Sequence, residues 1–210
     1  VLKDGSLQIN KREKDILLKS DFTTEVVADD ENTKKYLELF KNISVKNFNA
    51  NLKTVIKHSI NISFDKTFKI NNYSFKGNGE IKELNIDLYN PIKNNFLTKE
   101  IDKIFLKSSN LDYSFNSNNK NFINLNGNYS FNKKEFLKYK LENNFFKKNL
   151  GIKADLEIAE KIDLSLINYV KNENEIAQII FDITYKKNDI FFKKINYKQK
   201  KSLLEINNLK

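Results

Sequence analysis

Apolar and polar residues alternate with a period of two along most of this chain. Ile60, Ile62 and Phe64 show the pattern, and it returns at 111–115 and at 179–185. Side chains two residues apart on a β-strand point to the same face of the sheet. Each run therefore predicts a strand with one apolar and one polar face.

The connections between these runs predict an antiparallel meander. The chain has only one Pro and five Gly, so turns must be made largely by Asn, Asp and Lys, and Asn tolerates positive φ. The predicted turns separate runs of about ten residues, and they are Asn71-Asn72, Asn118-Asn119, Asn143-Asn144 and Lys187-Asn188-Asp189. We expect an all-β fold in which residues 1–210 form a single segment of an extended, curved sheet. Because the chain contains no Met, we expect it to be an interior segment of a longer protein.

Two segments depart from period two and predict short helices near 31–42 and near 98–107. The first follows acidic residues 29–31, and negative charge stabilises a helix N-terminus. The second has Thr98 as an N-cap and apolar residues at helical spacing behind it. Mid-strand glycines at 77–79 and at 127 predict bulges or places where the sheet curves.

The sequence carries no catalytic or metal-binding signature. Cys is absent and His58 is the only histidine, whereas a zinc site needs three or four ligands. We therefore expect His58 to lie at the surface or at a strand edge. No G-x-S-x-G motif and no phosphate-binding glycine loop is present. We expect no enzymatic activity, no metal and no cofactor.

The net charge of +10 does not by itself indicate nucleic-acid binding. Lys, Asn, Ile and Phe are the residues that AT-rich codons supply, so codon bias explains the basic composition. A stacking platform for bases also needs rings and cations on the same surface. Here Phe and Tyr fall in register with Ile and Leu, while Lys falls on the other face, so we expect no nucleic-acid partner.

Strands that each have one apolar and one polar face form a sheet whose apolar face must be shielded from water. Roughly 14 strands spaced by about 4.8 Å would form a sheet about 65 Å wide. The sheet can pack as a sandwich, close as a barrel or remain an open groove filled by an apolar ligand. For each inward residue, ordinary core packing competes with ligand contact. The candidate groove-lining residues are Ile60, Ile62, Phe64, Tyr73, Phe75, Ile86, Leu88, Tyr113, Phe115, Leu125, Tyr129, Phe131, Ile152, Leu156, Ile179, Phe181 and Ile183.

Several strands resemble those of a known family. The segments 72–82 (NYSFKGNGEIK), 123–131 (INLNGNYSF) and 203–209 (LLEINNL) are similar to the repeating strands of the AsmA-like superfamily, in particular its YhdP and TamB group. The likeness covers about residues 40–210 and is one of strand texture, and the many glycines of that family are mostly missing here. The resemblance implies an open groove with an apolar inner face.

The same resemblance implies a non-catalytic function in lipid transport. Members of that group are periplasmic segments of inner-membrane-anchored proteins of Gram-negative bacteria, and phospholipid acyl chains travel along their groove towards the outer membrane. The expected partner is phospholipid. Membrane contact would come from parts of the full-length protein outside this segment, with outer-membrane or periplasmic proteins as candidate partners.

Two alternatives stay open at this stage. One is a structural β-protein of the outer membrane or cell surface, although aromatic residues of a membrane barrel gather near strand ends, whereas Phe75, Phe115 and Phe181 are predicted in mid-strand. The other is a closed-barrel module that binds a single lipid.

Overall fold

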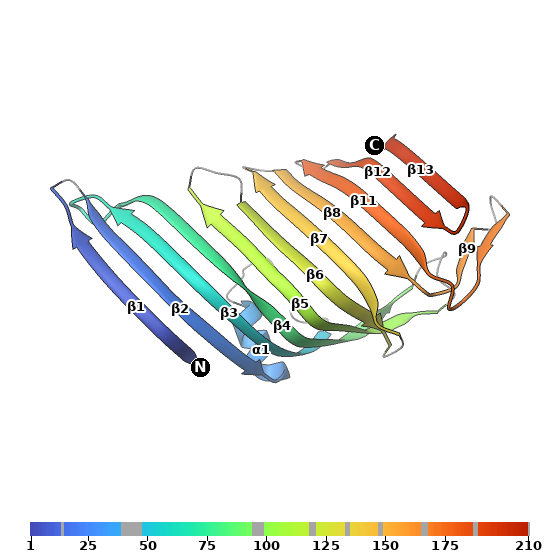
Figure 1. Ribbon diagram of the computed structural model, residues 1–210, viewed down its shortest axis with the longest axis horizontal. Helices are drawn as coiled ribbons and strands as arrows, with labels where there is room; N and C mark the ends of the chain where they lie inside the picture. The colour runs from blue at the N-terminus through green and yellow to red at the C-terminus, as the bar shows by residue number, and fades with distance from the viewer. Residues whose placement is uncertain are drawn as a thin grey trace.

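The computed structural model is dominated by one antiparallel sheet of eleven strands (Figure 1). It describes residues 1–13, 15–38, 48–93, 99–117, 121–132, 135–146, 149–164, 168–186 and 189–209. The order across the sheet is β1-β2-β3-β4-β5-β6-β7-β8-β11-β12-β13, so each strand pairs with its neighbour in this series. The strands are β1 (Leu2–Lys11), β2 (Ile16–Ala28), β3 (Phe48–Phe64), β4 (Ile70–Ile92), β5 (Ile101–Asn116), β6 (Asn121–Phe131), β7 (Leu137–Phe146), β8 (Asn149–Ile158), β11 (Ala177–Lys186), β12 (Asp189–Gln199) and β13 (Ser202–Leu209).

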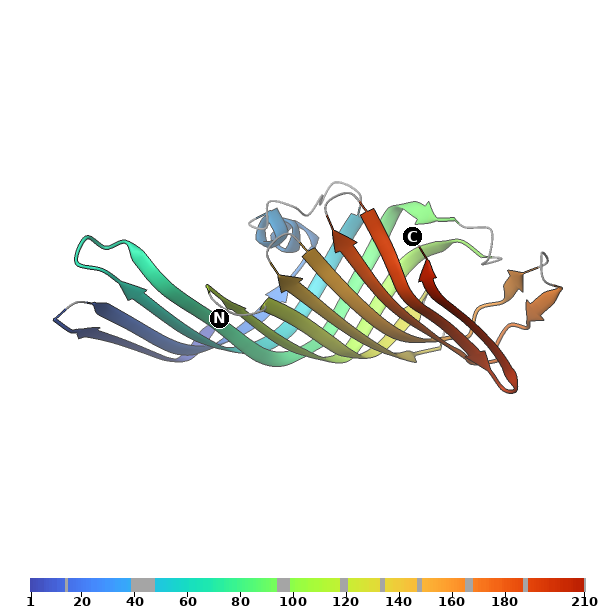
Figure 2. The same cartoon turned by 90° about the horizontal axis from the view of Figure 1, so that it is seen from above.

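The predicted fold class is confirmed, because the sheet is an open, curved meander (Figure 2). β1 and β13 form its two edges and do not pair with each other. Helix α1 (Asp30–Glu38) lies on the concave side in Figure 2. A second, two-stranded sheet consists of β9 (Ile162–Leu164) and β10 (Tyr169–Lys171).

Neighbouring strands approach closely at two glycines. A Cβ built on Gly127 would lie 2.5 Å from the Cα of Ser109 on the neighbouring strand. At Gly79 it would lie 2.1 Å from the carbonyl oxygen of Val55. Only glycine allows a neighbouring strand to fold so far over the face of the sheet. The prediction that these glycines mark bulges is confirmed at Gly127, which lies opposite the register shift between Lys107 and Asn110.

The predicted helix near 98–107 is wrong, because Ile101 begins strand β5. A bulge at Ser108, whose φ is 47°, interrupts the pairing of β5 with β6. An extra residue on one strand changes which side chains face the interior. The residues that face the interior therefore change from even numbers, such as Leu106, to odd numbers, such as Leu111. This break in the alternation gives the apolar residues a spacing that resembles that of a helix.

The predicted helix near 31–42 is confirmed as α1 for its described part. Asp29 caps its N-terminus, since the Asp29 carboxylate accepts a hydrogen bond of 3.0 Å from the backbone N–H of Asn32. Such a cap satisfies one of the orphan donors at a helix start. Asp30 also ties α1 to the sheet, because its carboxylate accepts a 2.8 Å bond from the backbone N–H of Ala50.

The predicted turns are partly wrong. Asn71-Asn72 lies inside β4 and Asn143-Asn144 inside β7, whereas Asn118-Asn119 and Lys187-Asn188 fall outside the described residues. The turn between β3 and β4 is formed by 65–69 instead. The expectation that Asn adopts positive φ is confirmed at Asn132, Asn168 and Asn174.

The two long sides of the sheet differ in their connections. Along one side, which we call the hairpin rim, segments 12–15, 65–69, 117–120, 147–148 and 187–188 join consecutive strands. Along the other, the loop rim, the joining segments are 29–47, 93–100, 132–136, 159–176 and 200–201. Figure 1 shows the strand tips of the hairpin rim along the top, with α1 and β9 on the opposite side. The loop rim therefore holds nearly all the chain that can cover the sheet.

Candidate functional site

All seventeen candidate groove residues lie on one face of the sheet, which we call the inner face. The register pairs Ile62 with Tyr73 and Phe75 with Phe115, and paired residues of antiparallel strands share a face. The same relation continues from β6 to β11, where Ile179 pairs with Leu156. The sequence pattern thus predicted the membership of this face, while its ligand stays a prediction.

Burial divides these seventeen residues unevenly. Tyr129 is buried, with 5% of its surface exposed, and the other sixteen are half-buried. A residue in a closed core is normally almost fully covered. Most of the inner face therefore has neighbours within the sheet but no second layer upon it.

The covered part of the inner face borders the loop rim. Tyr129, Leu137, Tyr139 and Ala159 form a buried cluster against which Leu125, Phe131 and Leu156 pack. A second cluster consists of Ile162, Ala177 and Tyr197 with Ile179 packed against it. The segments of the loop rim contribute Ala159 and Ile162. For Leu125, Tyr129, Phe131, Leu156 and Ile179, core packing is therefore part of their role.

The open part of the inner face borders the hairpin rim. Ile62, Phe64, Tyr73, Phe115 and Ile183 are half-buried there. None of these five residues is buried. The result is a largely apolar strip, interrupted by Asn143 on β7, that is backed by the sheet and has no cover in the described part of the chain.

Aromatic rings extend across the middle of the inner face. The Phe22 ring stacks on His58 with centroids 4.8 Å apart, and Phe115 lies 6.2 Å from Phe145, two strands away. Tyr113 belongs to the same series of rings, and its ring centroid lies 5.8 Å from that of Phe115. Contacts between residues two strands apart require side chains to converge, as they do on a concave face.

His58 is a half-buried inner-face residue in the middle of β3, so it does not lie at a strand edge. Its Nε2 lies 2.7 Å from the hydroxyl of Thr24, and its Nδ1 lies 2.6 Å from the hydroxyl of Tyr113. Burial lowers the pKa of His58 below its usual value. This group of three polar side chains interrupts the apolar surface in its centre.

The outer face is polar and carries cross-strand ion pairs. Lys53 pairs with Glu83 at 2.9 Å, and Lys194 pairs with Glu205 at 3.5 Å. The Lys53 ammonium holds the pKa of Glu83 below its usual range. Both partners in these pairs are well exposed, so each contributes little to stability. The predicted separation of Lys from the aromatic residues is only partly confirmed, because Phe105, Phe122 and Phe191 also lie on the outer face.

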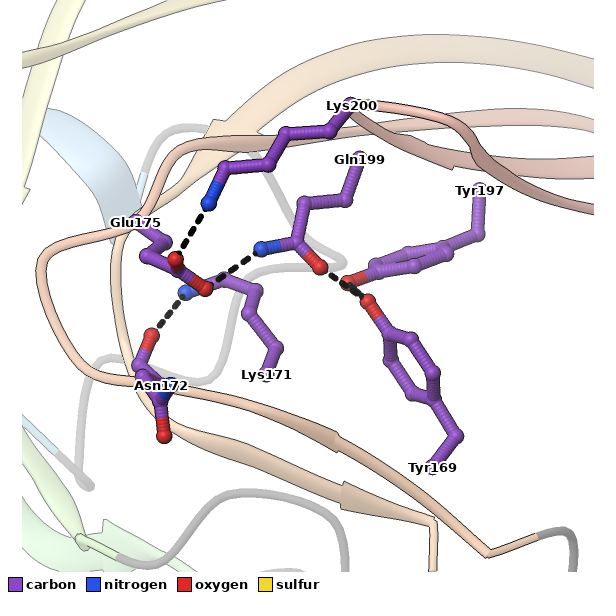
Figure 3. Close-up of polar contacts among 7 residues, drawn as sticks. All are labelled: Tyr169, Lys171, Asn172, Glu175, Tyr197, Gln199 and Lys200. Carbon is purple, nitrogen blue, oxygen red and sulfur yellow. Dashed lines mark hydrogen bonds and ion pairs between the residues drawn. The ribbon is translucent and has the colours of Figure 1, made fainter.

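A polar network holds the β9–β10 hairpin against the sheet (Figure 3). The Tyr169 hydroxyl lies 2.7 Å from that of Tyr197 and also donates to the side-chain carbonyl of Gln199. Gln199 donates in turn to Glu175 over 2.7 Å, and Lys200 donates to the same carboxylate over 2.6 Å. The network joins the loop before β11 to the end of β12, so this part of the loop rim stays over the inner face.

Lys171 lies beneath this network and is fully buried. Its ammonium donates to the backbone carbonyls of Glu160, over 2.6 Å, and Asn172, over 3.0 Å. Burial lowers the pKa of Lys171, while the nearby carboxylates of Glu160, Glu175 and Glu173 oppose that shift. Sequence reasoning missed this residue, because nothing in its local pattern distinguishes it from the many exposed lysines.

Among the described residues, His, Asp and Glu do not gather into a group that could hold a metal ion. No helix of the described chain is long and apolar enough to cross a membrane. The chain matches no protein-family model, no curated protein and no solved structure at a significant level.

Proposed function

We propose that this protein carries phospholipid acyl chains along the open strip of its inner face without catalysing a reaction. The observation that carries the proposal is the half-covered apolar face itself. Most inner-face residues near the hairpin rim are apolar and only half-buried, such as Ile62, Phe115 and Ile183, and no described segment lies over them. Exposed apolar surface of this extent is costly in water and indicates a binding surface.

The energetics favour an acyl chain as the occupant. Each buried methylene gains about 0.8 kcal/mol, so a chain of about 16 carbons gains roughly 12 kcal/mol when it leaves water. A strip that is largely apolar supplies shielding over most of its length. A chain could therefore move along it without crossing a large barrier, and no single residue would be indispensable.

The resemblance to the AsmA-like superfamily supports the same function and adds a location. On this resemblance we propose a periplasmic location, as part of an inner-membrane-anchored protein that passes lipid towards the outer membrane. The match is to strand texture at segments such as 72–82 and 123–131. The open sheet is the shape that such a function requires, and it differs from the closed barrel of the single-lipid alternative.

The direct test is to extract the purified, folded protein with organic solvent and to identify lipids by mass spectrometry. We expect phospholipid at a fixed molar ratio to protein. A folded sample whose extract contains no lipid contradicts the proposal and favours a structural role.

A second test places a charge on the open strip. We expect Phe115→Asp and Ile183→Asp each to reduce bound phospholipid and to slow the transfer of fluorescent lipid between vesicles, because a charge obstructs the path, while circular dichroism stays unchanged. Thr184→Asp is the matched control, because Thr184 precedes Tyr185 on β11 and faces outward. If Ile183→Asp unfolds the protein, or if both variants retain lipid, these positions are core and not part of the lipid path.

A further inference from the structure

Three polar side chains of the inner face, which we call the polar trio, come from three different strands. They are Thr24 on β2, His58 on β3 and Tyr113 on β5. The two ring nitrogens of His58 join the Thr24 and Tyr113 hydroxyls, over 2.7 and 2.6 Å. All three residues are half-buried, so the trio stands at the surface of the inner face and a ligand on that face can reach it.

The polar trio can donate a hydrogen bond to such a ligand. A neutral imidazole donates from one nitrogen and accepts at the other, so one of the two hydroxyls accepts from the ring. That hydroxyl keeps its own hydrogen for a further acceptor. The Thr24 hydroxyl lies 3.5 Å from the carbonyl oxygen of Ile56, at the limit of a hydrogen bond. A carbonyl oxygen of a ligand at shorter range would be the better acceptor.

Two rows of side chains lead from the polar trio across the inner face, because paired residues of antiparallel strands lie side by side on one face. The first row starts in the trio and consists of Tyr113, Ile123, Asn143, Ile152, Ile183 and Phe192. The second row starts two residues away and consists of Leu111, Leu125, Leu141, Ala154, Phe181 and Ile195. Ala154 is buried and the other members are half-buried.

The dimensions of the two rows suit one acyl chain. Residues two apart on a strand are separated by about 7 Å, so a single hydrocarbon chain between the rows can contact both. Four strand-to-strand steps of about 4.8 Å lead from Tyr113 on β5 to Ile183 on β11, a distance of about 19 Å. An extended chain of about 16 carbons has a similar length, since each bond advances it by about 1.3 Å.

Asn143 is the polar member of the first row beyond Tyr113, and its side chain is turned to the backbone. Its amide nitrogen donates to the carbonyl of Ile123 over 3.4 Å. The other members of both rows beyond Tyr113 are apolar. The polar end of a ligand is therefore matched by the trio, and its hydrocarbon by the rows.

We propose that the polar trio holds the carbonyl end of a single acyl chain, with the hydrocarbon along the two rows and its methyl end at β11 or β12. Thr24 or Tyr113 donates the hydrogen bond to the carbonyl oxygen, and the rows remove methylenes from water. This inference rests on the proposed function, because it concerns the same apolar face, and it adds a fixed orientation for the bound chain. A free fatty acid and the ester of a phospholipid share this chemistry.

The first test separates the polar end from the chain, by equilibrium dialysis of delipidated protein against radiolabelled palmitate and hexadecyltrimethylammonium. Both probes have a long alkyl chain, but only palmitate has a carbonyl. We expect Tyr113→Phe and Thr24→Val each to weaken palmitate binding about fivefold or more, because a hydrogen bond to the carboxylate is lost. Binding of the cationic probe should stay unchanged. The matched controls Tyr89→Phe and Thr23→Val should bind both probes like the unchanged protein, because Tyr89 and Thr23 lie on the outer face.

The second test determines the orientation with photoreactive palmitate. We expect a diazirine next to the methyl end to cross-link to β11 and β12, and a diazirine next to the carboxylate to cross-link to β2 to β5. Mass spectrometry of proteolytic peptides locates both. Cross-links from the methyl end that concentrate on β2 to β5, or that spread evenly over the sheet, overturn the inference.

Palmitoyl lysophosphatidylcholine distinguishes the two sources of the carbonyl. If Tyr113→Phe weakens its binding as it weakens that of palmitate, the trio accepts the ester of a phospholipid, whereas an effect on palmitate alone identifies a free fatty acid. Equal losses for palmitate and hexadecyltrimethylammonium, or unchanged palmitate binding, overturn the inference.

The inference and the proposed function can fail separately. Phospholipid in the organic extract, together with unchanged palmitate binding in Tyr113→Phe, leaves the proposed transport standing and removes only the role of the polar trio. A palmitate site that depends on the trio, in a protein whose extract contains no phospholipid, does the reverse.

Discussion

The ring of Tyr113 lies directly over Gly77 on the inner face. A Cβ built on Gly77 would lie 2.4 Å from two atoms of that ring. Gly77 on β4 stands in register with Tyr113 on β5 and with His58 on β3. The ring therefore crosses β4 and reaches His58, which is possible only because residue 77 has no side chain.

The three inner-face glycines should differ in their tolerance of alanine. At Gly79 and Gly127 the obstacle is the backbone of a neighbouring strand, which cannot move without breaking the pairing. At Gly77 the obstacle is the end of the Tyr113 side chain, which can rotate away. We expect Gly79→Ala and Gly127→Ala to cost about 3 kcal/mol or more, and Gly77→Ala about 1–2 kcal/mol. Urea unfolding monitored by circular dichroism measures these differences.

Gly151 provides the control for this series. A Cβ built on it would have no neighbour closer than 3.8 Å, and its register places it on the outer face. We expect Gly151→Ala to change the free energy of unfolding by less than about 0.5 kcal/mol. Equal effects at all four glycines would contradict the interpretation that the inner-face glycines permit curvature.

The sequence pattern predicted the strands and their faces because both depend on short-range order. A period of two assigns every residue of a strand to one face of the sheet. A shift of the strand pairing by one residue would move all apolar side chains of that strand to the opposite face. That constraint explains why residues as distant as Ile60 and Phe181 were correctly placed together. The prediction failed at Ile101, because the bulge at Ser108 changes the phase within β5, and no local signal marks that bulge.

The division of the inner face into a covered and an open half could not be predicted. It depends on where the segments between strands fold back, which is a matter of long-range contacts. Buried Lys171 and exposed Phe68 show the same limit. In both cases the residue type is common in this chain, and only the tertiary structure gives it an unusual environment.

Two leucines test the division directly. Leu137 in the covered half is 4% exposed, whereas Leu150 in the open half is half-buried. We expect Leu137→Ala to cost about 2–5 kcal/mol, as in other cores, and Leu150→Ala about 1 kcal/mol. Chemical unfolding of delipidated protein gives both values. Equal losses would mean that the open half is as tightly packed as the covered half.

Replacement of Lys171 should release the β9–β10 hairpin from the sheet. Lys171→Met keeps most of the side-chain volume but removes the donor to the carbonyls of Glu160 and Asn172. Loss of a buried donor leaves its acceptors without that bond, at a cost of about 1–3 kcal/mol. We expect faster amide hydrogen exchange in residues 159–177 and unchanged exchange in β3 to β6.

Lys161→Met is the control for Lys171→Met, because Lys161 lies in the same loop but is exposed. We expect it to leave hydrogen exchange and stability as they are. A uniform loss of protection throughout the sheet in Lys171→Met would mean that the hairpin and the sheet unfold as one unit. It would contradict the local role assigned to this lysine.

Protonation of His58 should destabilise the protein in a defined pH range. Burial lowers the pKa of His58 in the folded state, whereas the unfolded chain keeps a value of about 6.5. The unfolded state therefore binds the proton more readily. The stability that neutral His58 provides is complete above about pH 6.5 and is lost progressively as the pH falls towards the folded-state pKa. Phe22, Thr24 and Tyr113 contact the ring, and none of them carries a charge to offset the proton.

Melting temperatures measured between about pH 7.5 and pH 5 check this dependence. His58→Gln can still bond to Thr24 and Tyr113 but does not titrate, so its melting temperature should change less across this range. Carboxylates whose pKa is lowered, such as those of Asp65 and Glu83, lose their contribution only below about pH 4.5. Their effect therefore lies outside the range of the measurement. An identical pH dependence in His58→Gln and the unchanged protein would show that another group is responsible.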